Sequence, residues 1–157
     1  MADWTGILNE LQKSRGDFAG IRRRYLKRLN TLTKRNVIAY YSGWLQKPGA
    51  PNLGINDLDK NAFMATIKGL DRSKGLDLIL HTPGGDVAAT ESIIDYLTTM
   101  FSDIRVVVPQ LAMSGGTMIA CSANSILMGK HSSLGPIDPQ FVTPYGQIAA
   151  HGILEEF

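Results

Sequence analysis

The stretch that decides the fold is residues 76–85, which read Leu76-Asp77-Leu78-Ile79-Leu80-His81-Thr82-Pro83-Gly84-Gly85. A short apolar run that ends at proline and glycine is typical of a buried β-strand, so we expect a strand over residues 76–81. Pro83 cannot donate a backbone hydrogen bond, whereas Gly84 and Gly85 allow the backbone to approach a ligand closely. The stretch therefore predicts a buried strand followed by a turn with accessible amides.

A second glycine-bearing turn, Ala112-Met113-Ser114-Gly115-Gly116, follows the next predicted strand. The small and apolar residues after it predict a buried helix that ends near Ala123. Ser114 stands where this helix begins, so free amides and the positive end of the helix dipole favour negative charge beside its hydroxyl. Ligands bind at the carboxyl ends of the strands in α/β sheets. A hydroxyl nucleophile and amides that hold an oxyanion are what acyl transfer requires, so the two turns together predict that chemistry.

Strand and helix patterns alternate along the rest of the chain. This alternation predicts an α/β domain with a mostly parallel sheet flanked by helices and with right-handed crossovers. The expected elements are strands over residues 36–43, 104–109 and 125–129, helices over 56–70 and after Gly85, and loops over 44–55 and 134–140.

Composition restricts the class of protein. At 157 residues, with 44% apolar and 19% charged side chains, the chain has the size and composition of one globular domain. Cys121 is the single cysteine, which indicates a reducing, cytoplasmic setting. No apolar stretch reaches the roughly 18 residues that span a bilayer, and the N-terminus does not begin a signal peptide. The sequence shows neither zinc-ligand spacing nor a dinucleotide fingerprint, so we predict no metal and no cofactor.

Residues 1–35 differ from the rest of the chain in charge. They carry nine basic and three acidic side chains, a net charge of +6 that leaves −4 for residues 36–157. Apolar residues at helical spacing between Ile21 and Leu29 predict that residues 1–35 form a basic amphipathic N-terminal helix. Such a helix either binds nucleic acid or an anionic membrane surface, which would make the protein membrane-peripheral, or packs on the domain or a neighbouring subunit. We favour packing, because charge runs are usually solvated faces.

Four segments, taken in order, resemble the Clp-protease/crotonase superfamily. Within it the chain is most similar to the serine dehydrogenase proteinase family, which is related to signal peptide peptidase A, and the resemblance covers residues 36–141. It implies a Clp/crotonase-like fold over residues 36–157 and a serine endopeptidase that assembles as a homo-oligomer. The segments are His81-Thr82-Pro83-Gly84-Gly85-Asp86, Val106-Val107-Val108-Pro109, Ala112-Met113-Ser114-Gly115-Gly116-Thr117 and Leu134-Gly135-Pro136-Ile137-Asp138-Pro139-Gln140.

The resemblance also implies roles for individual residues. Ser114 matches the nucleophile that forms an acyl-enzyme with a peptide substrate. Gly84 and Gly85 match the glycines whose amides, together with that of Gly115, form the oxyanion hole. An extended substrate is expected to pair as a strand beside Gly85, with the loop over residues 134–136 as a second wall.

A serine nucleophile also needs a general base, which we leave unassigned. In Clp proteolytic subunits a histidine follows the nucleophile by about 25 positions, and the corresponding residues 136–139 contain none. Signal peptide peptidase relatives use a lysine that lies further along the chain or on a neighbouring subunit. Lys130, the only lysine after Ser114, is expected to be an exposed loop residue, and we expect His131 to be a surface residue. His81 is expected to order the first turn or fill the core.

We therefore prefer a Ser-Lys dyad whose lysine lies outside these residues. Relatives continue through further helices, so we expect the domain to be truncated at its C-terminus. Two other enzyme classes fit less well: an α/β-hydrolase needs an acid and a histidine well downstream, and acyl-CoA chemistry on this fold does not use a serine nucleophile. A catalytically inactive peptide-binding or assembly scaffold of the same fold stays open.

Overall fold

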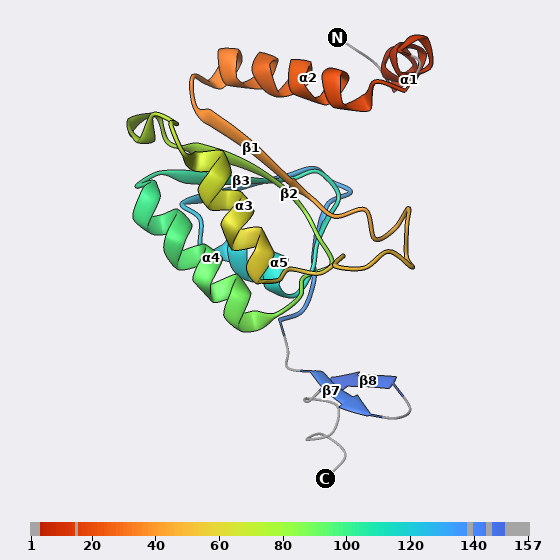
Figure 1. Cartoon of the computed structure of the whole chain (residues 1–157), viewed down its shortest axis with the longest axis vertical. Helices are drawn as coiled ribbons and strands as arrows, with labels where there is room; N and C mark the ends of the chain where they lie inside the picture. The colour runs from red at the N-terminus through yellow and green to blue at the C-terminus, as the bar shows by residue number, and fades with distance from the viewer. Residues whose placement is uncertain (1–3, 15, 138–139, 144–145, 150–157) are drawn as a thin grey trace.

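A four-stranded parallel sheet forms the centre of the protein in a computed structural model, which describes residues 4–14, 16–137, 140–143 and 146–149. The strands lie in the order β1-β2-β3-β5, and because neighbouring strands are parallel, a crossover connects each strand to the next (Figure 1). This arrangement confirms the predicted α/β class. The strands are β1 (Asn36–Tyr41), β2 (Leu76–His81), β3 (Ile104–Val108) and β5 (Ser125–Met128).

Three helices, α3 (Asp57–Ile67), α4 (Val87–Met100) and α5 (Gly115–Cys121), lie on one side of the sheet (Figure 1). Alternate residues of β2, Leu76, Leu78 and Leu80, are completely buried in the core beneath them. This period of two is what a strand with one core-facing side requires. The cluster continues into Ile38 of β1 and Val106 of β3.

Side chains fix where α3 and α4 begin. Asn56 caps α3 by accepting a hydrogen bond from the Leu58 amide at 3.0 Å, and Asp59 accepts one in return from the Asn56 amide at 2.9 Å. Asp86 caps α4 through its Oδ1 atom, 2.7 Å from the Ala89 amide nitrogen. Each helix therefore starts where the chain leaves the carboxyl edge of the sheet.

The basic N-terminal segment contains two helices, α1 (Trp4–Lys13) and α2 (Phe18–Thr33), where the sequence pattern predicted one over residues 1–35. The break falls at Gly16, whose φ of +92° suits glycine. Asp17 then caps α2, because its Oδ1 atom accepts a hydrogen bond from the Gly20 amide at 2.9 Å.

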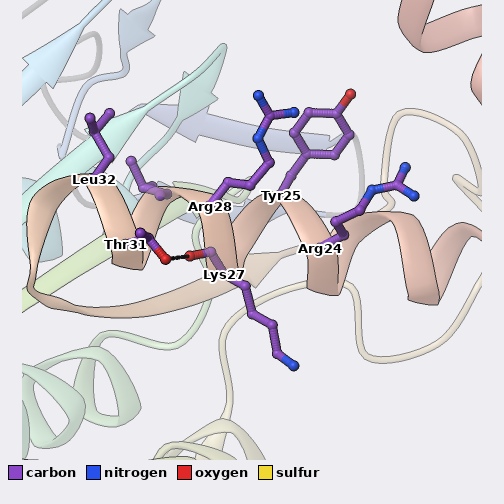
Figure 2. Close-up of a pocket in the computed structure, with 7 residues that line it drawn as sticks. Arg24, Tyr25, Lys27, Arg28, Thr31 and Leu32 are labelled. Carbon is purple, nitrogen blue, oxygen red and sulfur yellow. Dashed lines mark hydrogen bonds between the residues drawn. The ribbon is translucent and has the colours of Figure 1, made fainter.

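Helix α2 contacts β1 on the side of the sheet away from α3 and α4 (Figure 1). A cavity of about 360 Å³ remains between α2 and the sheet. A wider, open hollow lies along α2 itself, where Arg24, Tyr25 and Arg28 project from the helix (Figure 2). The Arg24 and Arg28 guanidinium carbons lie 5.8 and 5.5 Å from the centroid of the Tyr25 ring, within cation–π range.

Short strands complete the chain. β4 (Leu111–Ala112) pairs in parallel with β6 (Ser133–Leu134), and β7 (Gln140–Thr143) pairs with β8 (Gly146–Ala149) as an antiparallel hairpin. The loop expected over residues 134–140 thus begins in β6, and its Asp138 and Pro139 lie outside the described residues. No helix in the described part of the chain is long and apolar enough to cross a membrane.

Candidate active site

The two predicted turns lie side by side at the carboxyl edge of the sheet. Thr82, which follows β2, forms a parallel bridge with Ala112 of β4. The Thr82 amide donates to the Leu111 carbonyl oxygen at 3.2 Å, and the Met113 amide donates to the Thr82 carbonyl oxygen at 3.0 Å. This short pairing brings residues 83–85 next to Ser114.

Gly84 is the point of closest approach between the turns. Its φ is +90°, in the region that favours glycine. A Cβ atom at this position would lie 2.6 Å from both the Met113 carbonyl oxygen and the Ser114 Cβ atom, and 3.0 Å from the Gly115 amide nitrogen. Only a residue without a side chain allows the first turn to lie this close to Ser114.

Ser114 has a strained backbone and a free hydroxyl. Its φ of 50° and ψ of −118° lie outside the regions that residues with a side chain normally occupy, and such strain clusters at functional sites. The side chain is half-buried, and its hydroxyl forms no hydrogen bond with any residue that the structure describes. A serine on a sharp strand-to-helix turn is the arrangement that presents a nucleophile to a substrate.

The glycines after Ser114 let α5 pack tightly against neighbouring elements. A Cβ atom on Gly115 would lie 2.5 Å from the Thr90 hydroxyl oxygen in α4. A Cβ atom on Gly116 would lie 2.5 Å from the Cγ2 atom of Thr82. Both glycines therefore allow the start of α5 to sit directly against α4 and the first turn.

The backbone amides beside Ser114 differ in whether they already donate a hydrogen bond. The Gly84 amide donates to the Thr82 hydroxyl oxygen at 3.2 Å, within its own turn. The Gly85 and Gly115 amides donate to no acceptor in the described ranges of the chain. Free amides on either side of a nucleophile are what an oxyanion hole consists of.

One wall of the site is the segment after β6. The Gly135 amide lies 3.1 Å from the Ala112 carbonyl oxygen, and the Thr117 hydroxyl lies 2.8 Å from the Gly135 carbonyl oxygen. A Cβ atom on Gly135 would lie 2.2 Å from the Met113 sulfur atom. The hydrogen bond from Thr117 and the absence of a side chain on Gly135 therefore allow residues 134–136 to lie against the turn that carries Ser114.

Among the residues that the structure describes, no basic side chain considered from the sequence forms a hydrogen bond with Ser114. Lys130 is exposed in the turn after β5. The Nε2 atom of His131, also exposed, lies 3.1 Å from the Pro109 carbonyl oxygen. His151 lies outside the described residues.

His81 is buried at the end of β2, and only 4% of it is exposed. Its ring stacks on Tyr41 with a centroid separation of 5.1 Å and lies tilted against the Trp44 ring with a separation of 4.5 Å. Its Nδ1 atom is buried without a hydrogen-bond partner among the described residues, and burial lowers the pKa of His81 below its ordinary value. His81 therefore fills a buried position, which is one of the two expectations from the sequence, and it packs against the start of the loop over residues 44–55.

Two residues at this site carried no recognised signal in the sequence. Trp44 covers His81, and Ile55 pairs with the turn at Gly85 across a parallel bridge. Both lie at the ends of a loop that the sequence marks only as rich in proline and glycine. Their roles depend on contacts with the end of β2 and with the turn after it, at least 30 residues away along the chain.

Known proteins are similar to parts of this chain in sequence. A protein of Methanocaldococcus jannaschii is 41% identical over 97 residues, which are 62% of this chain and 32% of that protein. The ATP-dependent Clp protease proteolytic subunit of Streptococcus thermophilus is 37% identical over 71 residues, 43% of this chain and 36% of the subunit. The chain thus spans about a third of the length of the curated relatives it matches.

A solved structure supports the fold. The 1510-N membrane-bound stomatin-specific protease, in a lysine-to-alanine variant bound to a substrate peptide, superposes with a TM-score of 0.58 at 21% identity, covering 76% of this chain and 53% of that one. The family profile described as ClpP-like SDH-type serine proteinase matches residues 10–157. The chain therefore belongs to the ClpP-like SDH-type serine proteinases.

Proposed function

We propose that this chain is a serine endopeptidase that hydrolyses peptide bonds through an acyl-enzyme on Ser114. The observation that carries the proposal is the strained, unpaired Ser114 with the free amides of Gly85 and Gly115 beside it. Membership of a serine proteinase family supports the same reaction.

The reaction on this geometry proceeds by acyl transfer. The Ser114 hydroxyl oxygen attacks the peptide carbonyl carbon as its proton passes to a base, and the carbonyl oxygen becomes an oxyanion. The amides of Gly85 and Gly115 donate to that oxyanion, each worth about 3 to 4 kcal/mol in the transition state. The protonated base then gives its proton to the leaving amine, and water hydrolyses the resulting ester by the same steps.

Gly84 has a separate role in this proposal. Sequence resemblance implied that its amide also forms part of the oxyanion hole. Because that amide already donates to Thr82, we assign Gly84 to the close approach of the turn and keep Gly85 and Gly115 as the two donors.

An extended peptide is the substrate that this edge fits. Gly85 pairs with Ile55 on one side, which leaves its other side toward Ser114 for a substrate strand. Residues 134–136 form the facing wall next to Met113. Main-chain pairing of this kind accepts many sequences, because it reads the backbone rather than side chains.

We infer that the general base is a lysine outside this chain segment, which makes the mechanism a Ser-Lys dyad. The sequence resemblance to signal peptide peptidase relatives supports this assignment. The described structure offers Ser114 neither a histidine nor a lysine partner. A lysine supplied by another segment or by a neighbouring subunit would have to be desolvated to act as a base at neutral pH.

The second candidate function is an inactive peptide-binding scaffold. The observation that favours it is the same missing partner, because a serine without a base is a poor nucleophile. The two candidates differ in whether Ser114 reacts, so a covalent probe separates them.

The test is labelling by a fluorescent fluorophosphonate, followed by hydrolysis of fluorescein-labelled casein. We expect the parent chain to be labelled, Ser114→Ala to lose both signals, and Ser92→Ala to keep both. Ser92 is the matched control because it accepts a hydrogen bond from Lys60, a serine–lysine contact between α4 and α3 without free amides beside it. Labelling that persists in Ser114→Ala would reject the hydrolase and leave the scaffold.

We further propose that the protein assembles as a homo-oligomer, with α1, α2 and the loop over residues 44–55 as candidate contacts. The apolar cavity between α2 and the sheet and the exposed Leu45 support these surfaces. Sedimentation of the parent and of a chain lacking residues 1–35 tests the assembly. A second experiment tests the alternative role of the basic helices: it measures the binding of both chains to anionic vesicles and to nucleic acid at two salt concentrations.

A further inference from the structure

Ile55 touches both halves of the proposed oxyanion site. Its amide donates to the Gly84 carbonyl oxygen at 2.8 Å, and its carbonyl oxygen accepts from the Asp86 amide at 2.9 Å. Its side chain, only 2% exposed, reaches the other turn, where the Cδ1 atom would lie 3.3 Å from a Cβ atom on Gly115.

The hydrogen bond from Ile55 sets the direction of the Gly85 amide. The Gly84 carbonyl and the Gly85 N–H belong to one planar peptide group and point in opposite directions. Because Ile55 holds the Gly84 carbonyl on its own side, the Gly85 N–H points away from Ile55. A rotated peptide would present a carbonyl oxygen where the oxyanion forms, and it would break the pairing with Ile55.

Ile55 is itself held from both sides. Asn56, the next residue, is fixed by the capping box of α3, in which its amide donates to Asp59 at 2.9 Å. The loop before Ile55 is anchored at its start, because the Ser42 hydroxyl donates to the Leu53 carbonyl oxygen at 2.6 Å and the Ser42 amide to the His81 carbonyl oxygen at 2.8 Å. The position of Ile55 is therefore determined by α3 and by the end of β2.

Gly85 is packed so closely against the backbone of Ile55 that no side chain would fit there. A Cβ atom on Gly85 would lie 2.2 Å from the Ile55 amide nitrogen and 2.4 Å from its carbonyl oxygen. A Cβ atom on Gly54 would lie 3.2 Å from the Gly84 carbonyl oxygen. A displacement of Ile55 therefore passes directly to the peptide group that carries the proposed donor.

We propose that Ile55 is a positioning residue for catalysis, which orients the Gly85 amide through its backbone and the Gly115 turn through its side chain. This inference rests on the proposed serine peptidase function. It assigns Ile55 no contact with the reacting atoms, so its effect is on the transition state and not on the binding of the peptide chain.

The test compares Ile55→Ala with Ile67→Ala. Ile67 is equally buried, with none of its surface exposed, and lies at the opposite end of α3 from the site. We expect Ile55→Ala to slow fluorophosphonate labelling and to lower kcat on labelled casein by about 10- to 100-fold, with KM within about twofold of the parent. Ile67→Ala should keep kcat within about twofold despite a comparable loss of thermal stability.

A milder pair keeps the inference testable if the alanine variant does not fold. Ile55→Val removes only the methyl group that faces Gly115, and we expect a smaller loss of kcat that still exceeds the loss in Ile67→Val. Equal kcat values in the two members of either folded pair would overturn the positioning role while leaving the peptidase proposal intact. Labelling that does not depend on Ser114 would instead reject the peptidase, and this inference with it.

Discussion

Gly84 and Ser114 lie so close together that a Cβ atom on Gly84 would be 2.6 Å from the Cβ atom of Ser114. Side chains do not tolerate such a contact, so any substitution of Gly84 must push the two turns apart. The absence of a side chain at Gly84 therefore allows the proposed nucleophile to lie close to the proposed oxyanion donors.

Gly84→Ala should abolish most of the activity. A shift of about 1 Å at a reacting centre costs on the order of 100-fold in rate, and we expect a loss of this size in fluorophosphonate labelling. Gly69→Ala is the matched control, because Gly69 has a similar φ of +87° but no atom within 4 Å of its Cβ position. Both variants bear the strain of a positive φ, so the extra destabilisation of Gly84→Ala, about 1 to 3 kcal/mol, measures the clash. Equal stability and activity in the two variants would contradict the close approach.

The strain at Ser114 predicts a difference between two inactive variants. Both Ser114→Gly and Ser114→Ala remove the hydroxyl, but only glycine adopts a φ of 50° and a ψ of −118° freely. Relief of about 1 to 3 kcal/mol of strain exceeds the roughly 0.4 to 1 kcal/mol that glycine costs through the unfolded chain. We expect Ser114→Gly to be more stable than Ser114→Ala by about 1 kcal/mol in denaturant unfolding. A more stable alanine variant would show that the backbone there is relaxed.

His81 predicts a pH dependence of stability. Burial lowers the pKa of His81 in the folded protein below the unfolded value of about 6.5, so the unfolded chain binds the proton more readily. The free energy of unfolding should therefore fall as the pH drops through about 6.5, until the folded protein is protonated as well. His81→Phe keeps an aromatic ring in contact with Tyr41 and Trp44 but has no titrating group.

Chemical denaturation at about pH 8 and about pH 5.5 checks this expectation. The parent should lose more stability between the two pH values than His81→Phe. His131→Gln, which removes a histidine from an exposed turn, serves as the comparison. Parallel losses in the parent and in His81→Phe would show that His81 is not the responsible group.

A buried carboxylate in β2 holds the residue just before β1 and a residue of β3. The Asp77 side chain is completely buried, with Oδ1 2.6 Å from Arg35 Nε and Oδ2 2.7 Å from Arg105 Nη2. Removal of the charge leaves Arg105 without its hydrogen-bonded carboxylate and leaves Arg35 with only the exposed Asp103, so Asp77→Asn should lower the free energy of unfolding by about 3 to 5 kcal/mol. Asp71→Asn breaks an exposed pair with Lys74 and should change stability little. Similar unfolding midpoints for the two variants would contradict a structural role for Asp77.

Much of the fold follows from local sequence patterns. The apolar run over residues 76–81, which ends at proline and glycine, predicts the central strand, and Asn56 and Asp86 mark the starts of α3 and α4. These signals are legible because periodicity and helix caps act within a few residues along the chain. The basic run predicts one helix and hides the break between α1 and α2, because basic side chains lie on both sides of Gly16 and Asp17, the glycine and the capping residue at the break.

The sequence by itself determined which residues form the two turns, and it marked Ser114 as the nucleophile on which the proposed reaction depends. Only the tertiary structure decided how those turns meet. It showed that the Gly84 amide donates to Thr82, that the Gly85 and Gly115 amides have no acceptor among the described residues, and that Ile55 pairs with the first turn. Whether an amide is free depends on which acceptor lies within about 3 Å of it, and residues distant along the chain supply or withhold that acceptor.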